Sequence, residues 1–126
     1  MIENKTVLIT GGAGFIGSNL CEILLQQNNK VICMDNFLTG KKENIEPFFK
    51  NKNFNLIEGD IRNLSDCKKA VKSANIVLHQ AALGSVPRSI KDPVTTNEVN
   101  INGFLNMLIA THEEGIKRFV YAASSS

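Results

Sequence analysis

Glycines spaced like those of a phosphate-binding loop follow the first apolar run of the chain, Val7-Leu8-Ile9. Residues 11–17, Gly-Gly-Ala-Gly-Phe-Ile-Gly, contain Gly-x-x-Gly-x-x-Gly as well as Gly-x-Gly-x-x-Gly. The early glycines of such a stretch permit a tight turn and let backbone N–H groups approach a pyrophosphate, while the last lets a helix pack closely on the preceding strand. The spacing therefore predicts a strand-to-helix turn that binds the diphosphate of a dinucleotide, with Gly11 and Gly14 in the turn and Gly17 where the helix packs on the strand.

A carboxylate stands at the end of the second apolar run, where a dinucleotide site needs one. Asp35 lies eighteen residues after Gly17, and a carboxylate there accepts hydrogen bonds from the hydroxyl groups of an adenosine ribose. A 2′-phosphate would be repelled, so NAD is favoured over NADP, and we expect the nearby Lys41 and Lys42 to be solvated. The alternative is that the glycines form only a tight turn and Asp35 only caps a loop.

The third apolar run is followed by a residue with the chemistry to contact adenine. Asp60 comes directly after Gly59, and its carboxylate can accept a hydrogen bond from the adenine amino group. The competing interpretation is that Asp60 or Asn63 caps the next helix. The sequence leaves both roles open.

Five short apolar runs supply the strands that position these residues. Continuous apolar runs are typical of strands buried on both faces of a sheet. Helical patterns separate them, which gives the order βαβαβαβαβ and predicts an α/β fold with a doubly wound parallel sheet, a Rossmann fold, whose ligands bind at the carboxyl ends of the strands. The runs are Val7–Ile9, Val31–Met34, Phe54–Ile57, Ile76–Leu78 and Phe119–Tyr121.

The helices are predicted from apolar residues three and four positions apart. The longest is expected to begin after a capping carboxylate, Asp92, which Pro93 follows, and to end at Gly115. The residues expected to face the core are Ile16, Leu20, Ile23 and Leu24 in the first helix, Cys67, Ala70 and Val71 in a later one, and Ile101, Leu105 and Leu108 in the longest.

Length and composition indicate one folded domain. The chain has 126 residues, of which 43% are hydrophobic, and a formal net charge of +2, so we expect a single domain over residues 1–126. The basic residues form no run, which argues against nucleic acid as a partner. The sequence has neither an apolar stretch of membrane-spanning length nor the apolar core of a signal peptide, so no membrane association and a cytoplasmic location are expected.

Neither the cysteines nor the histidines predict a site. Cys21, Cys33 and Cys67 are odd in number and lack metal-ligand spacing, so we interpret them as buried residues, without a disulfide or a metal. His79 and His112 have no nucleophile at a readable spacing and are interpreted as structural.

Seven short motifs follow one another along the chain. They are residues 10–18, Asp35-Asn36, Gly59-Asp60-Ile61, residues 79–82 (His-Gln-Ala-Ala), Asp92-Pro93, residues 100–103 (Asn-Ile-Asn-Gly) and residues 122–126 (Ala-Ala-Ser-Ser-Ser). In this order they resemble the extended short-chain dehydrogenase/reductase superfamily, and within it the NAD-dependent nucleotide-sugar epimerases. Because the resemblance covers only the N-terminal portion of a family member, the fold is expected to be truncated after the fifth strand, with the substrate domain absent.

The resemblance implies NAD as the cofactor and identifies the positions that contact it. Ala81 and Ala82 follow the fourth strand, where small residues let a cofactor lie close, although tight packing explains them equally well. Asn100 matches a helix asparagine of the family, and Asn is also common on polar helix faces. The implied cofactor contacts are Gly11, Gly14, Phe15, Ile16, Gly17, Asp35, Asn36, Gly40, Asp60, Ile61, Ala81, Ala82 and Asn100.

Residues 84–89 resemble the substrate loop of family members that act on UDP-N-acetylhexosamines. Gly84 and Ser85 fall where the sugar and the nicotinamide meet in the family, and the small Gly84 leaves room for an N-acetyl group. Arg88 either meets the diphosphate of a UDP-sugar or faces solvent.

The resemblance implies reversible oxidation at C4 of the sugar, with a Tyr-x-x-x-Lys pair as base and a hydroxyl residue after the fifth strand. Ser124 is the first choice for that hydroxyl and Ser125 the second; the alternative is that the serines are only a polar chain end. Tyr121, the sole tyrosine, has Ser125 four places on instead of lysine, so it is not the base. We expect these 126 residues alone to be inactive.

Three other functions stay open, and so do two modes of self-association. A nucleotide-sugar dehydratase would carry residues resembling Thr-Asp-Glu at the position of the three terminal serines, which disfavours it. A nucleotide-sugar decarboxylase or a dinucleotide-binding module without chemistry is harder to distinguish from an epimerase. The resemblance also implies a homodimer through helices that include residues 101–112. The apolar side chains of an uncovered fifth strand, residues 119–122, offer another surface for self-association, and the sequence does not distinguish the two.

Overall fold

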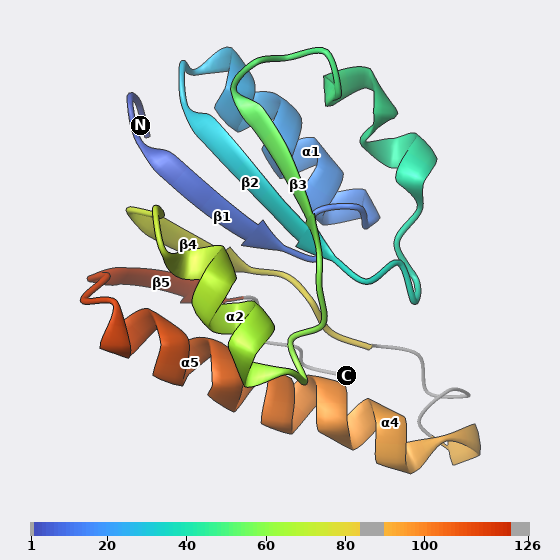
Figure 1. Cartoon of the computed structure of the whole chain (residues 1–126). Helices are drawn as coiled ribbons and strands as arrows, with labels where there is room; N and C mark the ends of the chain where they lie inside the picture. The colour runs from blue at the N-terminus through green and yellow to red at the C-terminus, as the bar shows by residue number, and fades with distance from the viewer. Residues whose placement is uncertain (1, 84–89, 122–126) are drawn as a thin grey trace.

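The computed structural model describes residues 2–83 and 90–121 of the chain. Within these residues five parallel strands form one sheet in the order β3-β2-β1-β4-β5, and helices lie on both of its faces (Figure 1). The predicted doubly wound α/β sheet is confirmed, and every run expected to be a strand is one. The strands are β1 (Thr6–Thr10), β2 (Lys30–Asp35), β3 (Phe54–Glu58), β4 (Ile76–His79) and β5 (Arg118–Tyr121).

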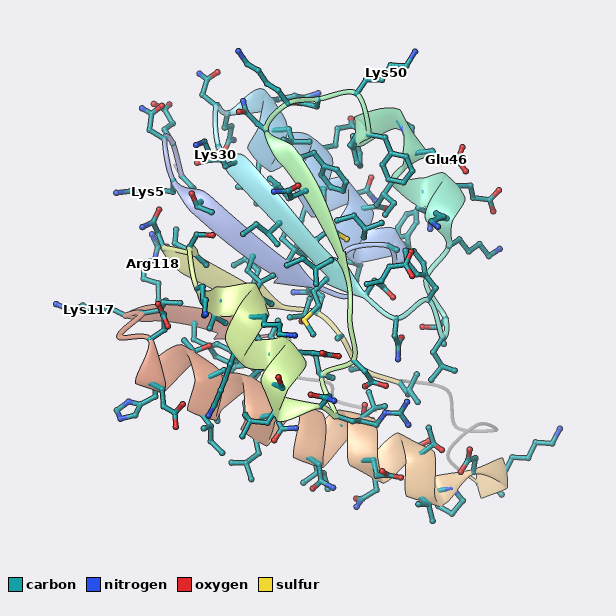
Figure 2. All side chains as sticks on the ribbon, in the orientation of Figure 1. Lys5, Lys30, Glu46, Lys50, Lys117 and Arg118 are labelled. Carbon is teal, nitrogen blue, oxygen red and sulfur yellow. The ribbon has the colours of Figure 1, made fainter. Side chains whose placement is uncertain are left out.

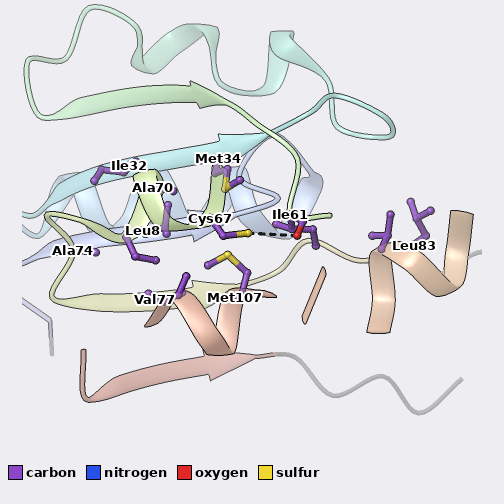
Figure 3. Close-up of a cluster of buried hydrophobic side chains, with 13 residues drawn as sticks. Leu8, Ile32, Met34, Ile61, Cys67, Ala70, Ala74, Val77, Leu83 and Met107 are labelled. Atoms are coloured by element: carbon purple, nitrogen blue, oxygen red, sulfur yellow. Dashed lines mark hydrogen bonds between the residues drawn. The ribbon is translucent and has the colours of Figure 1, made fainter. Parts of the chain in front are cut away.

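Side chains of each central strand alternate between two hydrophobic cores. The helix α1 (Phe15–Gln26) covers one face of the sheet, while α2 (Leu64–Val71) and α5 (Phe104–Glu113) cover the other (Figure 1). Figure 3 shows the core beneath α2 and α5, where Met34 and Met107 belong to one cluster and the Cys67 thiol donates a hydrogen bond to the Ile61 carbonyl at 3.4 Å. Burial on both faces explains why the strands read as continuous apolar runs.

The three cysteines belong to these cores, as predicted. Cys21, Cys33 and Cys67 are free and buried. Burial raises the pKa of the Cys67 thiol to about 12, and a hydrogen bond with Cys21 together with burial raises the pKa of Cys33. All three therefore act as small apolar residues, because a reactive cysteine needs access to solvent.

The helix α1 approaches the sheet through small residues. Gly17, Cys21 and Leu24 are buried against it, whereas Ile16 and Ile23 are 60% and 48% exposed. The expectation that Ile16 and Ile23 face the core was wrong. Gly17 and Cys21 permit a closer approach of the helix to the sheet than isoleucines would. The helix therefore faces the sheet with its small residues, and Ile16 and Ile23 lie on the solvent side.

The longest helix also faces the core with residues other than those its apolar spacing predicts. It consists of α4 (Pro93–Asn97), a π-helical turn (Glu98–Gly103) and α5. Gly103 determines the contact face, because a Cβ there would lie 2.5 Å from the Ile61 side chain. As a consequence Ile101, Leu105 and Leu108 are exposed, and the buried residues are Val99, Gly103, Met107, Ala110 and Thr111.

Both predicted ends of this helix are confirmed. The Asp92 carboxylate accepts a hydrogen bond from the Thr95 N–H at 3.2 Å, and Pro93 occupies the first helical position. At the other end, Gly115 has a φ of +76°, the left-handed conformation that commonly terminates a helix.

The connection between β2 and β3 is the one place where the order of elements differs from the prediction. Two short 3-10 turns, Lys42–Asn44 and Glu46–Phe48, occupy the position expected for a helix. Pro47 lies in the second turn and has no backbone N–H to donate to the Glu43 carbonyl, so an α-helix cannot continue through it. The buried Ile45 between them anchors the segment to the α1 side of the sheet.

Exposed basic side chains lie at the end of the sheet where the strands begin. Figure 2 shows Lys5, Lys30, Lys117 and Arg118 along this end, before or at the first residues of β1, β2 and β5.

In the part of the chain that the structure describes, no helix is both long and apolar enough to cross a membrane, and no three His, Cys, Asp or Glu residues are grouped to hold a metal ion.

A side-chain network ties the end of β4 to the end of β1. The Thr10 hydroxyl lies 2.7 Å from His79 Nδ1 and accepts hydrogen bonds from the N–H groups of Gln80 and Ala81 at 3.1 and 3.2 Å. The Gln80 N–H also donates to the Thr10 carbonyl, at 3.0 Å. Burial lowers the pKa of His79 to about 4, so the imidazole is neutral at neutral pH.

This network predicts that the fold weakens as the pH falls below 6.5. The pKa of His79 is lower in the fold, about 4, than the 6.5 of an exposed histidine, so its contribution is complete above pH 6.5 and is lost as the pH falls toward 4. The free energy of unfolding should decrease by up to about 1.4 kcal/mol per pH unit in this window. Urea denaturation between pH 7 and 5.5 measures the slope. The variant His79→Asn keeps an acceptor and does not titrate, so an equal slope in both proteins would contradict the assignment.

Candidate nucleotide-binding site

A pocket of about 270 Å³ lies at the carboxyl ends of the strands, where the segments that follow β1, β2, β3 and β4 converge. Every predicted cofactor contact except Asn100 lines it. The lining residues are Gly11, Gly14, Phe15, Ile16, Gly17, Met34, Asp35, Asn36, Leu38, Thr39, Gly40, Gly59, Asp60, Ile61, Gln80, Ala81, Ala82, Leu83 and Val99.

The glycine-rich loop is packed so closely that two of its members tolerate no side chain. Gly11 has a φ of +70°, and a Cβ there would lie 2.8 Å from the Ala81 nitrogen. A Cβ on Gly17 would overlap the Gly11 carbonyl oxygen and lie 2.8 Å from the Gly12 Cα. The loop therefore has the tight turn and the close helix contact that its glycine spacing predicts.

The first turn of α1 has no side chain that satisfies its backbone donors. Gly14 is the N-cap residue and makes no side-chain cap, and the first turn holds no acidic residue. The first N–H groups of a helix lack partners within the helix and carry a partial positive charge, so they attract an anion. Because Phe15 and Ile16 of this turn line the pocket, the residues fit the diphosphate of a dinucleotide.

Asp35 is buried at the end of β2, and backbone donors hold its carboxylate in place. Oδ2 accepts a hydrogen bond from the Ala13 N–H at 2.9 Å, and Oδ1 accepts one from the Phe37 N–H at 2.8 Å. Phe37 adopts a φ of +59°, a strained conformation for an aromatic residue that is compatible with a functional turn. Each carboxylate oxygen retains a lone pair for a ribose hydroxyl.

Asp60 lines the pocket as predicted, but its carboxylate is shared with a neighbouring cation. The Arg62 guanidinium lies 2.6 Å from Oδ2 through its Nη2, and Arg62 Nε donates to both carboxylate oxygens at 3.0 Å. Hydrogen bonds from Arg62 hold the pKa of Asp60 below its usual value. Asn63 rather than Asp60 caps α2, because its side chain accepts a hydrogen bond from the Asp66 N–H at 3.0 Å.

A side chain that the sequence did not single out fixes the segment around Asp60 and Ile61. Asn106 of α5 donates from Nδ2 to the Ile61 carbonyl at 2.9 Å. Asparagine is unfavourable inside a helix. The position of Asn106 within an apolar helical run therefore indicated that its side chain makes a specific hydrogen bond. Arg62 was missed for a different reason, since an arginine after a strand is ordinarily solvated.

The segment after β4 is held by Asn100, which was predicted to contact the cofactor. Its side-chain oxygen accepts from the Leu83 N–H at 2.7 Å, and its Nδ2 donates to the Leu83 carbonyl at 2.7 Å. Asn100 thus acts on the pocket through Leu83, which is a lining residue. Asn100 lies in the π-helical turn Glu98–Gly103, and π-helical turns often occur at functional sites.

The predicted substrate contacts and hydroxyl donors lie outside the described residues. These are Gly84, Ser85 and Arg88 after β4, and Ser124 and Ser125 after β5. Their roles stay predictions.

The packing of the loop predicts that Gly17→Ala destabilises the fold more than Gly14→Ala. The added methyl group at residue 17 must displace the Gly11 carbonyl, whereas a Cβ at Gly14 meets only that oxygen, at 3.3 Å. Overpacking of this kind costs about 1–3 kcal/mol, and urea denaturation of both variants measures the difference. Equal stability of the two variants would show that the loop relaxes freely.

Known proteins are similar to this chain in fold and in sequence. The solved UDP-N-acetylglucosamine 4-epimerase of Methanobrevibacter ruminantium, in complex with UDP-N-acetylmuramic acid, is 38% identical with a TM-score of 0.89, and the match covers 98% of this chain and 39% of that one. The UDP-glucose 4-epimerase of Thermus thermophilus, solved with NAD, is 40% identical with a TM-score of 0.84 over 94% of this chain and 37% of its own. UDP-glucuronic acid decarboxylase 1 of Danio rerio is 34% identical over 122 residues, which are 97% of this chain and 28% of that protein.

The chain therefore spans between 28% and 39% of the length of these relatives. The sequence pattern of the NAD dependent epimerase/dehydratase family matches residues 7–126, from β1 through the last residue. This match confirms the predicted resemblance, and it confirms NAD as the cofactor. The chain belongs to the NAD dependent epimerase/dehydratase family.

Proposed function

We propose that residues 1–126 form the NAD-binding domain of a UDP-sugar 4-epimerase. The observation that carries the proposal is the Asp35 carboxylate, which the Ala13 N–H holds beside the uncapped N-terminus of α1 in one pocket. A ribose hydroxyl can donate to this carboxylate, and a 2′-phosphate is repelled by it. The 4-epimerases of Methanobrevibacter ruminantium and Thermus thermophilus support the choice of reaction.

NAD supplies reversible hydride transfer at C4 of the sugar when it is bound. In this proposal the residues of this chain bind and orient it: the 11–17 loop and the first N–H groups of α1 hold the diphosphate, Asp35 orients the adenosine ribose, and Ala81 and Ala82 border the nicotinamide side. Ser124, or else Ser125, donates a hydrogen bond to the sugar 4-oxygen as charge develops there.

The general base of the reaction is proposed to come from a part of the protein beyond this sequence. The sequence contains no Tyr-x-x-x-Lys, and its sole tyrosine, Tyr121, packs edge-on against Phe104 with ring centroids 4.9 Å apart. The 126-residue chain alone is therefore proposed to bind NAD without catalysing epimerisation.

The substrate is proposed to be a UDP-hexose or a UDP-N-acetylhexosamine. Gly84, Ser85 and Arg88 are the proposed contacts, with Gly84 leaving room for an acetamido group. The protein that contains this segment should interconvert the C4 epimers of one of these substrates, while the isolated chain should not. ¹H NMR of the anomeric protons follows both reactions, and turnover by the isolated chain would contradict the proposed division of roles.

A nucleotide-sugar decarboxylase is the second candidate, because UDP-glucuronic acid decarboxylase 1 of Danio rerio matches nearly the whole chain. The two reactions differ in their products. An epimerase inverts C4 and retains every carbon, whereas a decarboxylase releases CO2 from UDP-glucuronic acid. Release of CO2 without C4 inversion would favour the decarboxylase, and NAD binding without either reaction would favour a binding module.

The proposed ribose contact predicts that Asp35→Asn weakens NAD binding and removes the discrimination against NADP. Hydrogen bonds to a charged group contribute about 1.5–3 kcal/mol, so the Kd for NAD should rise about tenfold or more. Isothermal titration calorimetry with NAD and NADP measures both effects, and Glu22→Gln, an exposed carboxylate on α1, is the control. An unchanged ratio of the two affinities would exclude Asp35 as the ribose contact.

A homodimer through α5 is proposed from its exposed apolar face. Leu105 of α5 is 52% exposed, and Ile101 of the preceding π-helical turn is 59% exposed; they lie one turn apart beside the exposed Leu108. Apolar side chains grouped in this way usually mark an interface.

The α5 interface predicts a mass of two chains by sedimentation velocity for the wild type. Leu105→Asp should give a single chain, because a buried unpaired charge is costly. Ile23→Asp, at an exposed apolar position on α1, should remain a dimer. A monomeric wild type, or a dimer that Leu105→Asp leaves intact, would refute this interface.

A further inference from the structure

The segment that follows β2 returns to the glycine-rich loop and encloses Ala13. The Ala13 N–H donates to Asp35 Oδ2 at 2.9 Å. Its carbonyl accepts two hydrogen bonds, from the Lys41 N–H at 3.0 Å and from Asn44 Nδ2 at 2.9 Å. Ala13 is fully buried, so the main chain of one residue is held from both sides by residues 35–44.

The space inside this enclosure is small. A Cβ on Gly40 would lie 2.8 Å from Asp35 Oδ2 and 3.0 Å from the Ala13 Cβ. Residues 36–44 therefore leave no room for a side chain at residue 40, beside the carboxylate oxygen that is proposed to meet a ribose hydroxyl.

Asn44 is the side chain that closes the enclosure. It ends the 3-10 turn Lys42–Asn44, and the buried Ile45 next to it fixes its backbone. The donors from Asn44 and Lys41 use both lone pairs of the Ala13 carbonyl, and the next N–H, that of Gly14, donates to the Gly11 carbonyl at 3.1 Å. The asparagine therefore orients the peptide that precedes the N-terminus of α1.

We propose that Asn44 is a positioning residue for ribose recognition, acting through Ala13 on the Asp35 carboxylate. The proposal rests on the proposed function, since it assumes that Asp35 meets the adenosine ribose. Asn44 is not among the residues that line the pocket. It sets how well the carboxylate is aligned with the 2′-hydroxyl.

The test compares ADP with 2′-deoxy-ADP as probes, by calorimetric titration of the full chain. The wild type should bind ADP about tenfold more tightly than 2′-deoxy-ADP, because only ADP has a 2′-hydroxyl that can donate a hydrogen bond to Asp35. Asn44→Ala should reduce this ratio to about threefold or less while changing the Kd for 2′-deoxy-ADP less than about twofold. Asn55→Ala, at an exposed position on β3, should leave both affinities unchanged.

Asn44→Asp is the second variant, because it keeps the size of the side chain but cannot donate a hydrogen bond when ionised. It should reduce the ratio of the affinities for ADP and 2′-deoxy-ADP at least as much as Asn44→Ala. Urea denaturation of each variant establishes that it is folded. A ratio unchanged in both variants, or an equal loss of affinity for the two probes, would overturn the proposal by assigning Asn44 a structural role. Equal binding of the two probes by the wild type would instead refute Asp35 as the ribose contact, and with it the proposed function.

Discussion

The hydrogen bond from the Ala13 N–H to the Asp35 carboxylate joins the two parts of the pocket that a nucleotide needs together. β1 and β2 are neighbours in the sheet, with Thr10 paired to Met34, so the loop after one strand lies against the end of the other. A buried carboxylate needs hydrogen-bond donors, and the glycine-rich loop provides one. This hydrogen bond therefore joins the proposed diphosphate site to the proposed ribose site.

The rest of the pocket is built largely from main chain held by polar side chains. Asn44, Asn100 and Asn106 each hydrogen-bond a backbone group of a different loop at the carboxyl ends of the strands. Thr10 does the same for the residues after β4, and its hydroxyl also forms a hydrogen bond with His79 Nδ1. Close approach of a cofactor requires small residues and exposed main chain, and such loops need anchors of this kind to keep their shape.

The strands and the glycine-rich loop could be predicted because each is encoded locally, as an apolar run or a spacing of glycines. Asp35 could be predicted because it ends a strand at a known distance from that loop. The side of α5 that faces the core could not be predicted, because apolar residues occur on both sides of the helix. The close contact between Gly103 and Ile61, which are far apart in sequence, determines which side is buried. Asn44 was missed for the same reason: its partner, Ala13, lies 31 residues away.

The most direct test of the account is an NAD titration followed by the backbone amide resonances of the ¹⁵N-labelled chain. The account predicts that the amides of Ala13, Gly14 and Phe15 shift together with that of Phe37, because all lie at the diphosphate and ribose contacts. The amides of Lys30 and its neighbours, at the opposite end of the sheet, should not shift. Shifts confined to other parts of the chain, or none at saturating NAD, would contradict the assignment of this pocket.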